Sequence, residues 1–436
     1  MNFPTSLIFP IDSAVNANGH LVLGGCDVVD LITEFGTPLY VFDEATIRGQ
    51  CRDFRDAFAR GESENRVVYA AKAFINKGLA QILMEEGLGM DVVSGGELAI
   101  ARAVEFPPEN IYFHGNNKSP DELREAMDYG VGRIVVDNFT ELDLLDRMAN
   151  TEGKRQRILL RISPGVDPHT HAHTTTGTLD SKFGFPLDTG QADQAMKQAI
   201  EAQGLDLIGL HFHLGSPVFE MDPYVQAVEA VVNLAKSYAN HGFDFKEFSP
   251  GGGFAIAYTL DDEPPTPAAY AKTITEVVQR TCSESGLDVP RLVVEPGRAL
   301  IGRAGVALYT VGATKDIPDI RRYIAVDGGM GDNIRPALYD ARYEAVVANK
   351  MGHQATQLVT IAGKYCESGD ILVRDVMLPP TEFGDLIAIP AVGAYCLSMA
   401  STYNMNPRPP VVLVNSGQSR LLRRRETYED MMTLDL

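Results

Sequence analysis

The sequence predicts an α/β protein with an added β part: a (β/α)8 barrel and a second, β-rich (β-barrel-like) domain. Eight short apolar runs alternate with helical patterns over about 250 residues, which is the strand count and length of a closed barrel. After residue 300 the runs stay strand-like, but long helical stripes are absent. We therefore expect residues 44–300 to form the barrel, and residues 1–43 and 301–436 to form the β-rich domain.

The expected barrel strands are apolar runs rich in β-branched and aromatic residues. They lie at 67–71, 89–94, 110–114, 133–137, 158–163, 207–213, 246–249 and 291–295. A helix is expected at 44–60, and Ser94 with Glu97 and Asn138 with Glu141 have the spacing of capping boxes that start later helices. An open doubly wound sheet is the rival, but no GxGxxG follows the first strand.

The flanking segments predict mainly strands. Before the barrel we expect strands at 20–23 and 38–42 and a helix at 27–35. After it we expect strands at 305–314, 323–327, 357–362, 385–395 and 411–415. The first 40 residues should join these later strands, because they too lie outside the barrel pattern.

Composition narrows the class of protein. The chain has 436 residues, with 45% hydrophobic and 22% charged, which are globular values. Its net charge is −20, from 38 basic and 58 acidic residues, so nucleic acid and acidic membranes are poor partners. The five cysteines are scattered without CxxC spacing, and no 18-residue apolar stretch occurs. We expect a cytoplasmic protein with reduced thiols.

The first barrel strand ends in a lysine, Lys72. An ammonium is costly to bury at a strand end unless it is paired or loses its charge. A lysine that loses its charge becomes a nucleophilic amine suited to forming a Schiff base with a carbonyl. The alternative is a side chain that simply extends to solvent.

Polar and glycine residues gather at the carboxyl ends of the expected strands, where barrel active sites lie. They are Lys72, Asp91, Ser94, His114, Arg161, His211, His213, the glycines at 251–253, Glu295 and Arg298. The glycine turn offers unobstructed backbone amides suited to a phosphate, and Gly297 with Arg298 offers a second turn with a guanidinium. Glu295 either pairs with Arg298 or holds a proton on a cofactor nitrogen.

His211 and His213 lie on the same face of one strand, which raises a metal site as an alternative. The same spacing recurs at His169, His171 and His173. We expect no metal, because matching carboxylates are few and the lysine and glycine turns would have no role.

Together the motifs resemble the alanine-racemase-type, fold-III pyridoxal-phosphate decarboxylases, and within them the diaminopimelate decarboxylases. The resemblance covers essentially the whole chain. The matching motifs are YAAKA at 69–73, DVVSGGEL at 91–98, FHGNNK at 113–118, HTTTG at 173–177, KFG at 182–184, HFHLGS at 211–216, GGG at 251–253, EPGR at 295–298, DGGMGDNIRPALY at 327–339, CES at 366–368 and GAYCLSMAS at 393–401.

The resemblance implies a pyridoxal 5'-phosphate site. Lys72 would carry the cofactor through its amine, His211 would stack on the pyridine ring, and Glu295 would keep the pyridine nitrogen protonated. The cofactor phosphate would be held by a further set of residues: Ser216, Gly252, Gly297, Arg298 and Tyr395.

It also implies a substrate site. Arg298, Arg335, Tyr339 and Tyr395 would bind the carboxylate at the non-reacting end of an amino acid, and Glu367 its ammonium. Cys366 would protonate the carbon that loses CO2, since a thiol is mostly protonated at neutral pH. Cys366 and Glu367 would reach the other subunit's cofactor, so the β-rich domain would supply substrate and dimer-interface residues in a homodimer with shared sites.

The implied reaction is decarboxylation of meso-2,6-diaminopimelate to L-lysine and CO2, the last step of lysine biosynthesis. The nearest rival is a sister decarboxylase acting on ornithine, lysine or arginine, which would have no use for Arg298 together with Arg335. A metal-dependent barrel hydrolase using His211 and His213 is the rival from another class. Pro217 departs from the family, since many relatives have glutamine there.

Overall fold

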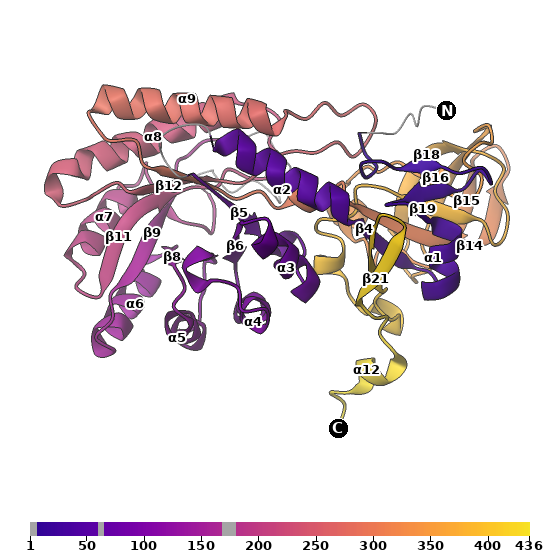
Figure 1. Cartoon of the computed structure of the whole chain (residues 1–436), viewed down its shortest axis with the longest axis horizontal. Coiled ribbons are helices and arrows are strands. Elements are labelled where there is room, and N and C mark those ends of the chain that lie inside the picture. Colours follow the sequence, from indigo (N-terminus) through magenta and orange to yellow (C-terminus); the bar gives the residue numbers. More distant parts are fainter. Residues whose placement is uncertain (1–6, 60–64, 168–179) are drawn as a thin grey trace. The chain divides into compact units, whose positions relative to one another are not determined.

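The computed structural model describes residues 7–59, 65–167 and 180–436. The chain divides into two compact units (Figure 1). One consists of Cys51–Ala255 and Pro264–Gly297, and the other of residues up to Gln50, Ile256–Glu263 and Arg298–Leu436. The first unit contains the barrel, and the second contains most of the remaining strands.

The barrel closes through eight parallel strands in the order β5-β6-β7-β8-β9-β11-β12-β13, with β13 pairing back to β5. The strands are β5 (Arg66–Ala70), β6 (Gly89–Val92), β7 (Ile111–Phe113), β8 (Arg133–Val136), β9 (Gln156–Ser163), β11 (Leu205–His211), β12 (Glu247–Gly251) and β13 (Arg291–Val294). A short extra strand, β10 (Phe185–Pro186), pairs with β9. The predicted (β/α)8 barrel and its eight runs are confirmed.

The barrel interior is filled by side chains. Five of them form one buried cluster: Val68, Tyr112, Val135, Leu159 and Val293. Because they come from different strands around the ring, they fill it as a layer. The barrel is therefore a packed core, and its polar chemistry is confined to the strand ends.

Helices connect the strands and pack around the barrel (Figure 1). They are α3 (Lys77–Glu85), α4 (Gly95–Ala103), α5 (Pro120–Tyr129), α6 (Phe139–Thr151), α7 (Gln191–Glu201), α8 (Asp222–Tyr238) and α9 (Pro267–Ser285). Another helix, α2 (Glu44–Phe58), leads from the second unit into the first.

Two of the helix starts differ from the expected capping boxes. Ser94 and Asn138 do accept the backbone N–H groups of Glu97 and Glu141. The glutamates do not reach back to these capping residues, however. Each accepts from the residue one position earlier, Val93 at 2.7 Å and Asp137 at 3.2 Å, and so ties the strand end to the helix start.

The second unit is β-rich, as predicted. Its main sheet runs β18-β17-β15-β14-β4-β20-β21, with β19 pairing to β14 and β16. The strands are β4 (Leu39–Asp43), β14 (Gly305–Ile317), β15 (Arg321–Val326), β16 (Val346–Val347), β17 (Gln357–Ala362), β18 (Ile371–Leu378), β19 (Leu386–Ile389), β20 (Val411–Asn415) and β21 (Gln418–Arg423). β4 lies between β14 and β20, so a strand from before the barrel is central to this sheet.

Short elements complete the second unit. They are β1 (Ala14–Val15), β2 (Leu21–Leu23), β3 (Cys26–Asp27), α1 (Val28–Phe35), α10 (Arg298–Ile301), α11 (Arg335–Tyr339) and α12 (Tyr428–Met432). The expected strand at 385–395 is too long. β19 ends at Ile389, because Pro390 follows it and Ala391 and Tyr395 take positive φ values of 58° and 61°. Among the helices described here, none is long and apolar enough to cross a membrane.

Candidate active site

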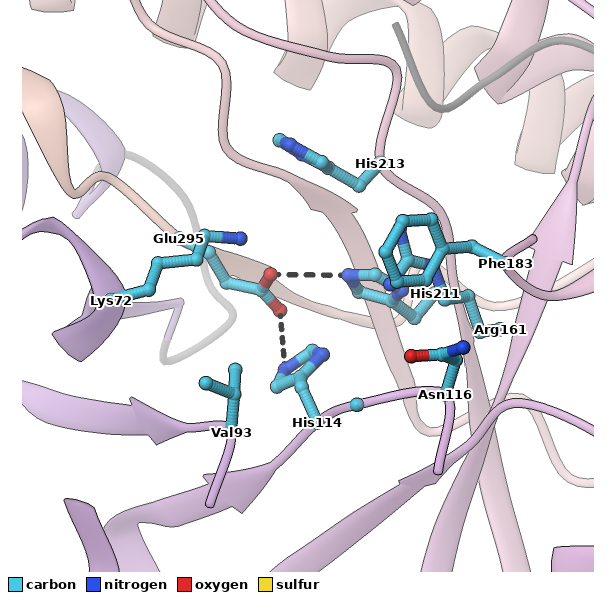
Figure 2. Close-up of a pocket in the computed structure, with 10 residues that line it drawn as sticks. Lys72, Val93, His114, Asn116, Arg161, Phe183, His211, His213 and Glu295 are labelled. Carbon is cyan, nitrogen blue, oxygen red and sulfur yellow. Dashed lines mark hydrogen bonds and ion pairs between the residues drawn. The ribbon is translucent and has the colours of Figure 1, made fainter. Parts of the chain in front are cut away.

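A cavity of about 340 Å³ lies at the carboxyl ends of the barrel strands (Figure 2). It is lined by Lys72, Val93, His114, Gly115, Asn116, Arg161, Phe183, His211, His213 and Glu295. Lys72, His211 and Glu295 follow or end β5, β11 and β13, so the closing of the ring brings together residues that are far apart in sequence. This is the end of the barrel at which the sequence places the site.

Lys72 sits in a single 3-10 turn, Ala71–Ala73, directly after β5. Ala71 and Ala73 are buried on either side of it, while the Lys72 side chain is exposed to the cavity. Of the two alternatives that the sequence leaves for Lys72, a buried amine and a side chain that extends away from the strand end, the structure has the second. The turn tilts it out of the apolar strand end, so that its amine is open to an incoming carbonyl.

Glu295 is 6% exposed, and both of its carboxylate oxygens have polar neighbours. Ser249 Oγ donates to Oε1 at 2.8 Å, and His211 Nε2 lies 3.1 Å from Oε2. His114 Nε2 lies 3.4 Å from Oε1. Burial alone would raise the pKa of Glu295, but the neighbouring imidazoles of His211 and His114 outweigh it and hold the pKa well below its usual value. The cavity therefore has a fixed anion at its base.

His211 is 1% exposed, and burial lowers its pKa to about 4 despite the opposing effect of Glu295. At neutral pH the ring is thus uncharged, and its Nε2–H donates to Glu295. Its Nδ1 has no hydrogen-bond partner among the residues that the structure describes, and its ring meets that of His114 edge-on, with ring centres 4.8 Å apart. His211 therefore supports the carboxylate from the side.

The low pKa of His211 predicts that this side chain contributes a loss of stability in acid to the protein with its cofactor removed. Between pH about 6.5, where an unfolded histidine titrates, and pH about 4, the unfolded chain binds the proton and the folded chain does not. The free energy of unfolding should fall by up to about 1.4 kcal/mol per pH unit in this window from His211. His213, whose pKa burial also holds well below its usual value, acts in the same direction.

Denaturant titrations at several pH values measure this slope. His211→Asn should make it shallower, whereas His241→Asn, at an exposed position after α8, should keep the wild-type slope. A full wild-type slope in His211→Asn would contradict the assignment.

The structure brings together a different set of possible metal ligands from the one that the sequence suggests. Within the described ranges, the residues that could hold an ion together are His114, His211 and Glu295, whose ligand atoms lie within 4.8 Å of one another. His213 is not in this group, and its Nδ1 instead accepts the Gly252 N–H at 3.3 Å. The predicted pairing of His211 with His213 is therefore not what the fold assembles. The HxHxH run at 169–173 lies outside the described residues.

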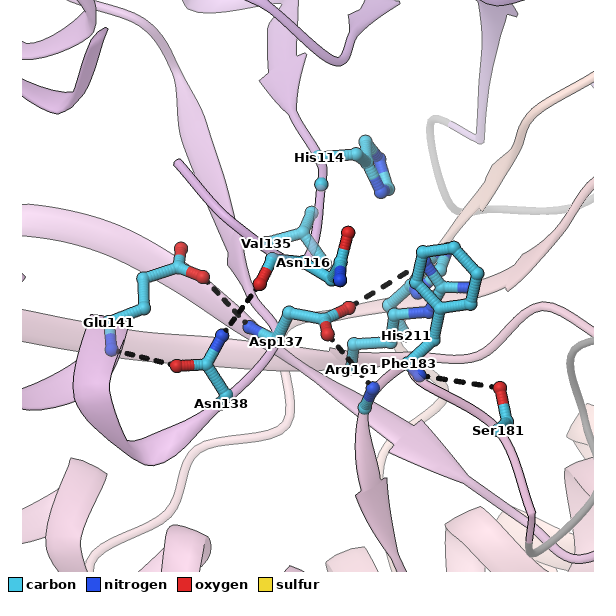
Figure 3. A network of polar contacts seen from close by, with 12 residues as sticks. His114, Asn116, Val135, Asp137, Asn138, Glu141, Arg161, Ser181, Phe183 and His211 are labelled. Carbon is cyan, nitrogen blue, oxygen red and sulfur yellow. Dashed lines mark hydrogen bonds and ion pairs between the residues drawn. The ribbon is translucent and has the colours of Figure 1, made fainter. Parts of the chain in front are cut away.

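A second polar network borders the cavity beside His211 (Figure 3). Arg161 lies with its guanidinium 4.3 Å from the centre of the Phe183 ring and 3.7 Å from Asp137 Oδ1. Asp137 Oδ2 accepts the Gly184 N–H at 3.1 Å, so the carboxylate ties β8 to the segment that carries Phe183. This wall is built from residues that the sequence either listed without a role or did not single out.

The two glycine turns pack closely against the segments that carry Glu295 and Lys72. A Cβ on Gly252 would come 2.2 Å from the Glu295 carbonyl oxygen, and one on Gly297 would come 3.0 Å from the Ala70 Cβ, beside the turn of Lys72. Gly253 has φ +102°, and its carbonyl accepts from Val218, which links the turn to the segment of Ser216. Only glycine allows these close approaches, because any side chain at these positions would collide with neighbouring atoms.

Arg298 and Arg335, the two arginines predicted to bind the substrate, both lie in the second unit, where each donates to a tyrosine hydroxyl. Arg298 Nη1 donates to the Tyr258 hydroxyl, and Arg335 Nη1 donates to the Tyr343 hydroxyl. The Arg298 guanidinium also lies 4.8 Å from the centre of the Tyr395 ring. Arg298 and Arg335 are each 6% exposed, so two cations are buried among aromatic rings.

The other three predicted residues are more open. Cys366 and Glu367 are exposed on a turn between β17 and β18, and Tyr339 is half-buried at the end of α11. The Cys366 N–H donates to Asn404 Oδ1 at 2.8 Å, and Tyr365 stacks on Tyr403 with ring centres 6.0 Å apart. The turn is thus anchored while its thiol faces outward.

The sequence does not reveal the part that several of these residues play. His114 and Arg161 were expected at strand ends without a role, and His213 only as a partner of His211 in the metal alternative. Tyr258 and Tyr343 were not expected at all. For the strand-end residues, position was the available signal; the tyrosines lie in irregular segments and give none.

Comparison with known proteins identifies the family. The family described as "Pyridoxal-dependent decarboxylase, pyridoxal binding domain" matches residues 44–302. The chain therefore belongs to the pyridoxal-dependent decarboxylases. It is 48% identical to the diaminopimelate decarboxylase of Bacillus subtilis (97% of each chain covered) and 43% identical to that of Synechocystis (99% of this chain, 93% of the relative).

A solved structure of diaminopimelate decarboxylase from M. jannaschii, in complex with L-lysine, has a TM-score of 0.92 at 34% identity and covers 97% of both chains. Within the family, the chain thus groups with the diaminopimelate decarboxylases. It is a carboxy-lyase whose cofactor is pyridoxal phosphate. The family resemblance inferred from the motifs is confirmed.

The cavity fits this cofactor. It offers an open amine at Lys72 and a carboxylate kept ionised at Glu295. An aldehyde and a pyridine nitrogen match these two features in turn. A buried imidazole nitrogen, His211 Nδ1, has no hydrogen-bond partner in the described chain.

Proposed function

We propose that this protein decarboxylates meso-2,6-diaminopimelate to L-lysine and CO2, the last step of lysine biosynthesis, acting at the D-configured centre. The observation that carries this substrate is the pair of buried guanidiniums, Arg298 and Arg335, which both contact Tyr258. Guanidiniums bind carboxylates through paired hydrogen bonds. Such a pair suits an amino acid with a second carboxylate, which ornithine and lysine lack at the non-reacting end.

Pyridoxal phosphate supplies the electron sink for the electrons left by departing CO2. Lys72 would bind it through its amine and exchange that bond for the substrate's amine. Glu295, kept anionic by Ser249, His211 and His114, would hold a proton on the pyridine nitrogen.

His211 and His213 would have different roles beside the pyridine ring of the cofactor. The stacking role was assigned to His211, but its Nε2 is occupied by Glu295 and its ring is almost fully enclosed. His213 lines the same cavity, is more exposed, and lies beside Lys72 in Figure 2. We therefore assign stacking to His213, and to His211 the support of Glu295. Ser216, Gly252, Gly297, Arg298 and Tyr395 would hold the phosphate.

For the substrate, Arg298 and Arg335 would bind the carboxylate at the non-reacting end, with Tyr339 and Tyr395 beside them. Glu367 would bind the neighbouring ammonium. Cys366 would give its proton to the carbon from which CO2 leaves.

We further propose a homodimer in which Cys366 and Glu367 complete the partner's site. Both lie exposed on an anchored turn, which is the position that a residue acting on another subunit needs. We place the enzyme in the cytoplasm, since all five cysteines are free of disulfides.

The proposal is tested by incubating the purified holoenzyme with meso-diaminopimelate and measuring CO2 and lysine. Equimolar CO2 and L-lysine are expected. Release of CO2 from ornithine, lysine or arginine but not from diaminopimelate would reject the proposal in favour of a sister decarboxylase.

A further inference from the structure

Tyr258 contacts both of the buried arginines of the second unit. It belongs to Ile256–Glu263, a stretch between β12 and α9 that packs with the second unit although its neighbours in sequence belong to the barrel. Arg298 donates to the Tyr258 hydroxyl, while the Arg335 guanidinium lies over the ring, 4.5 Å from its centre. One side chain thus contacts both cations through two different groups.

Tyr258 is itself held in place. The backbone N–H groups of Tyr258 and Thr259 donate to Asp262 Oδ2 at 2.8 and 2.9 Å, which closes the turn. The Tyr258 ring meets Tyr343 edge-on, with ring centres 5.4 Å apart and planes at 88°. The residue is 8% exposed, so close packing restrains the ring and allows it to restrain the groups that it contacts.

Arg335 has an unusual environment for a buried cation. Its described polar partner is the Tyr343 hydroxyl, which also lies 3.6 Å from Cys396 Sγ, and no carboxylate in the described chain forms an ion pair with it. A buried guanidinium normally requires a paired anion. Aromatic faces and a hydroxyl hold Arg335 here, so a ligand carboxylate would supply the missing counter-charge.

We propose that Tyr258 is a positioning residue that sets the spacing and orientation of Arg298 and Arg335, and thereby selects ligands with a carboxylate at the non-reacting end. This inference rests on the proposed function. The ring face offsets the repulsion between two like charges, and the hydroxyl fixes the direction of the Arg298 fork. The two arginines are then set for a carboxylate before it arrives, which lowers the ordering cost of binding.

The test compares two competitive inhibitors of the holoenzyme, with meso-diaminopimelate as substrate. L-lysine retains the non-reacting carboxylate, and 1,5-diaminopentane is the same chain without it. Tyr258→Phe, which removes the hydroxyl and keeps the ring, should raise the substrate KM and the lysine Ki about threefold. Tyr258→Leu should raise both about twentyfold. The Ki of diaminopentane should change less than about twofold in either variant, because no carboxylate is involved.

The control is Tyr238→Phe, which removes a buried tyrosine hydroxyl bonded to Asp193 on α7. It should leave both inhibition constants unchanged. Equal weakening of lysine and diaminopentane by the Tyr258 variants would overturn the positioning role, and so would an unchanged lysine Ki. If Tyr258→Leu does not fold, Tyr258→Phe decides alone. Failure of wild-type enzyme to turn over diaminopimelate would instead refute the proposed function and this inference with it.

Discussion

Replacing Lys72 with alanine will abolish covalent attachment of pyridoxal phosphate and lower kcat by about a thousandfold or more. Lys72 is the lysine of the described cavity lining, and its side chain is open to the cavity. Without the Lys72 amine, the cofactor would remain a free aldehyde. The substrate amine would then have to react with this aldehyde directly, instead of displacing Lys72 from a carbon–nitrogen bond that already exists. The visible absorbance of the purified protein and its rate of CO2 release measure the two effects.

Lys77→Ala is the matched control for Lys72→Ala. Lys77 is exposed at the first position of α3, only five residues further along the chain, and does not line the cavity. It should retain the wild-type absorbance and rate. A yellow Lys72→Ala protein with the wild-type spectrum would show that another amine carries the cofactor.

Lys72 illustrates what the sequence could predict. Its place at the end of the first barrel strand followed from hydrophobic periodicity, because apolar runs of strand length mark a buried parallel strand. Its exposure did not follow, because the 3-10 turn depends on the packing of Ala71 and Ala73 in the finished barrel. The position was predictable and the orientation was not.

The same distinction holds elsewhere. The eight strands and the β-rich character of the second unit follow from local patterns. Tyr258 lies within residues assigned in sequence to the barrel but packs with the second unit, and no local pattern reveals this. Likewise, the place of His211 at a strand end was predictable, and it lines the cavity, but its hydrogen bond to Glu295 depends on the pairing of β11, β12 and β13.

Cys366→Ala should keep the cofactor bound and lower kcat by about a hundredfold or more, since a positioned proton donor contributes factors of that size. Cys366 is exposed, and the turn that carries it is held by the bond to Asn404 and by the stacked pair Tyr365 and Tyr403. Its thiol is therefore available to a second subunit. Unchanged absorbance with a loss of kcat and little change in KM would separate proton transfer from cofactor binding.

A mixture of two inactive variants tests whether the site is shared. In a hybrid dimer of Lys72→Ala and Cys366→Ala, one site would hold both defects and the other neither, provided that Cys366 acts across the interface. After subunit exchange, random pairing makes half of the dimers hybrids, so activity should recover to about a quarter of wild type. If each Cys366 served its own subunit, no hybrid would contain an intact site and mixing would restore nothing. Recovery would thus establish both the dimer and the direction in which the thiol acts, because a monomeric enzyme offers no route to it.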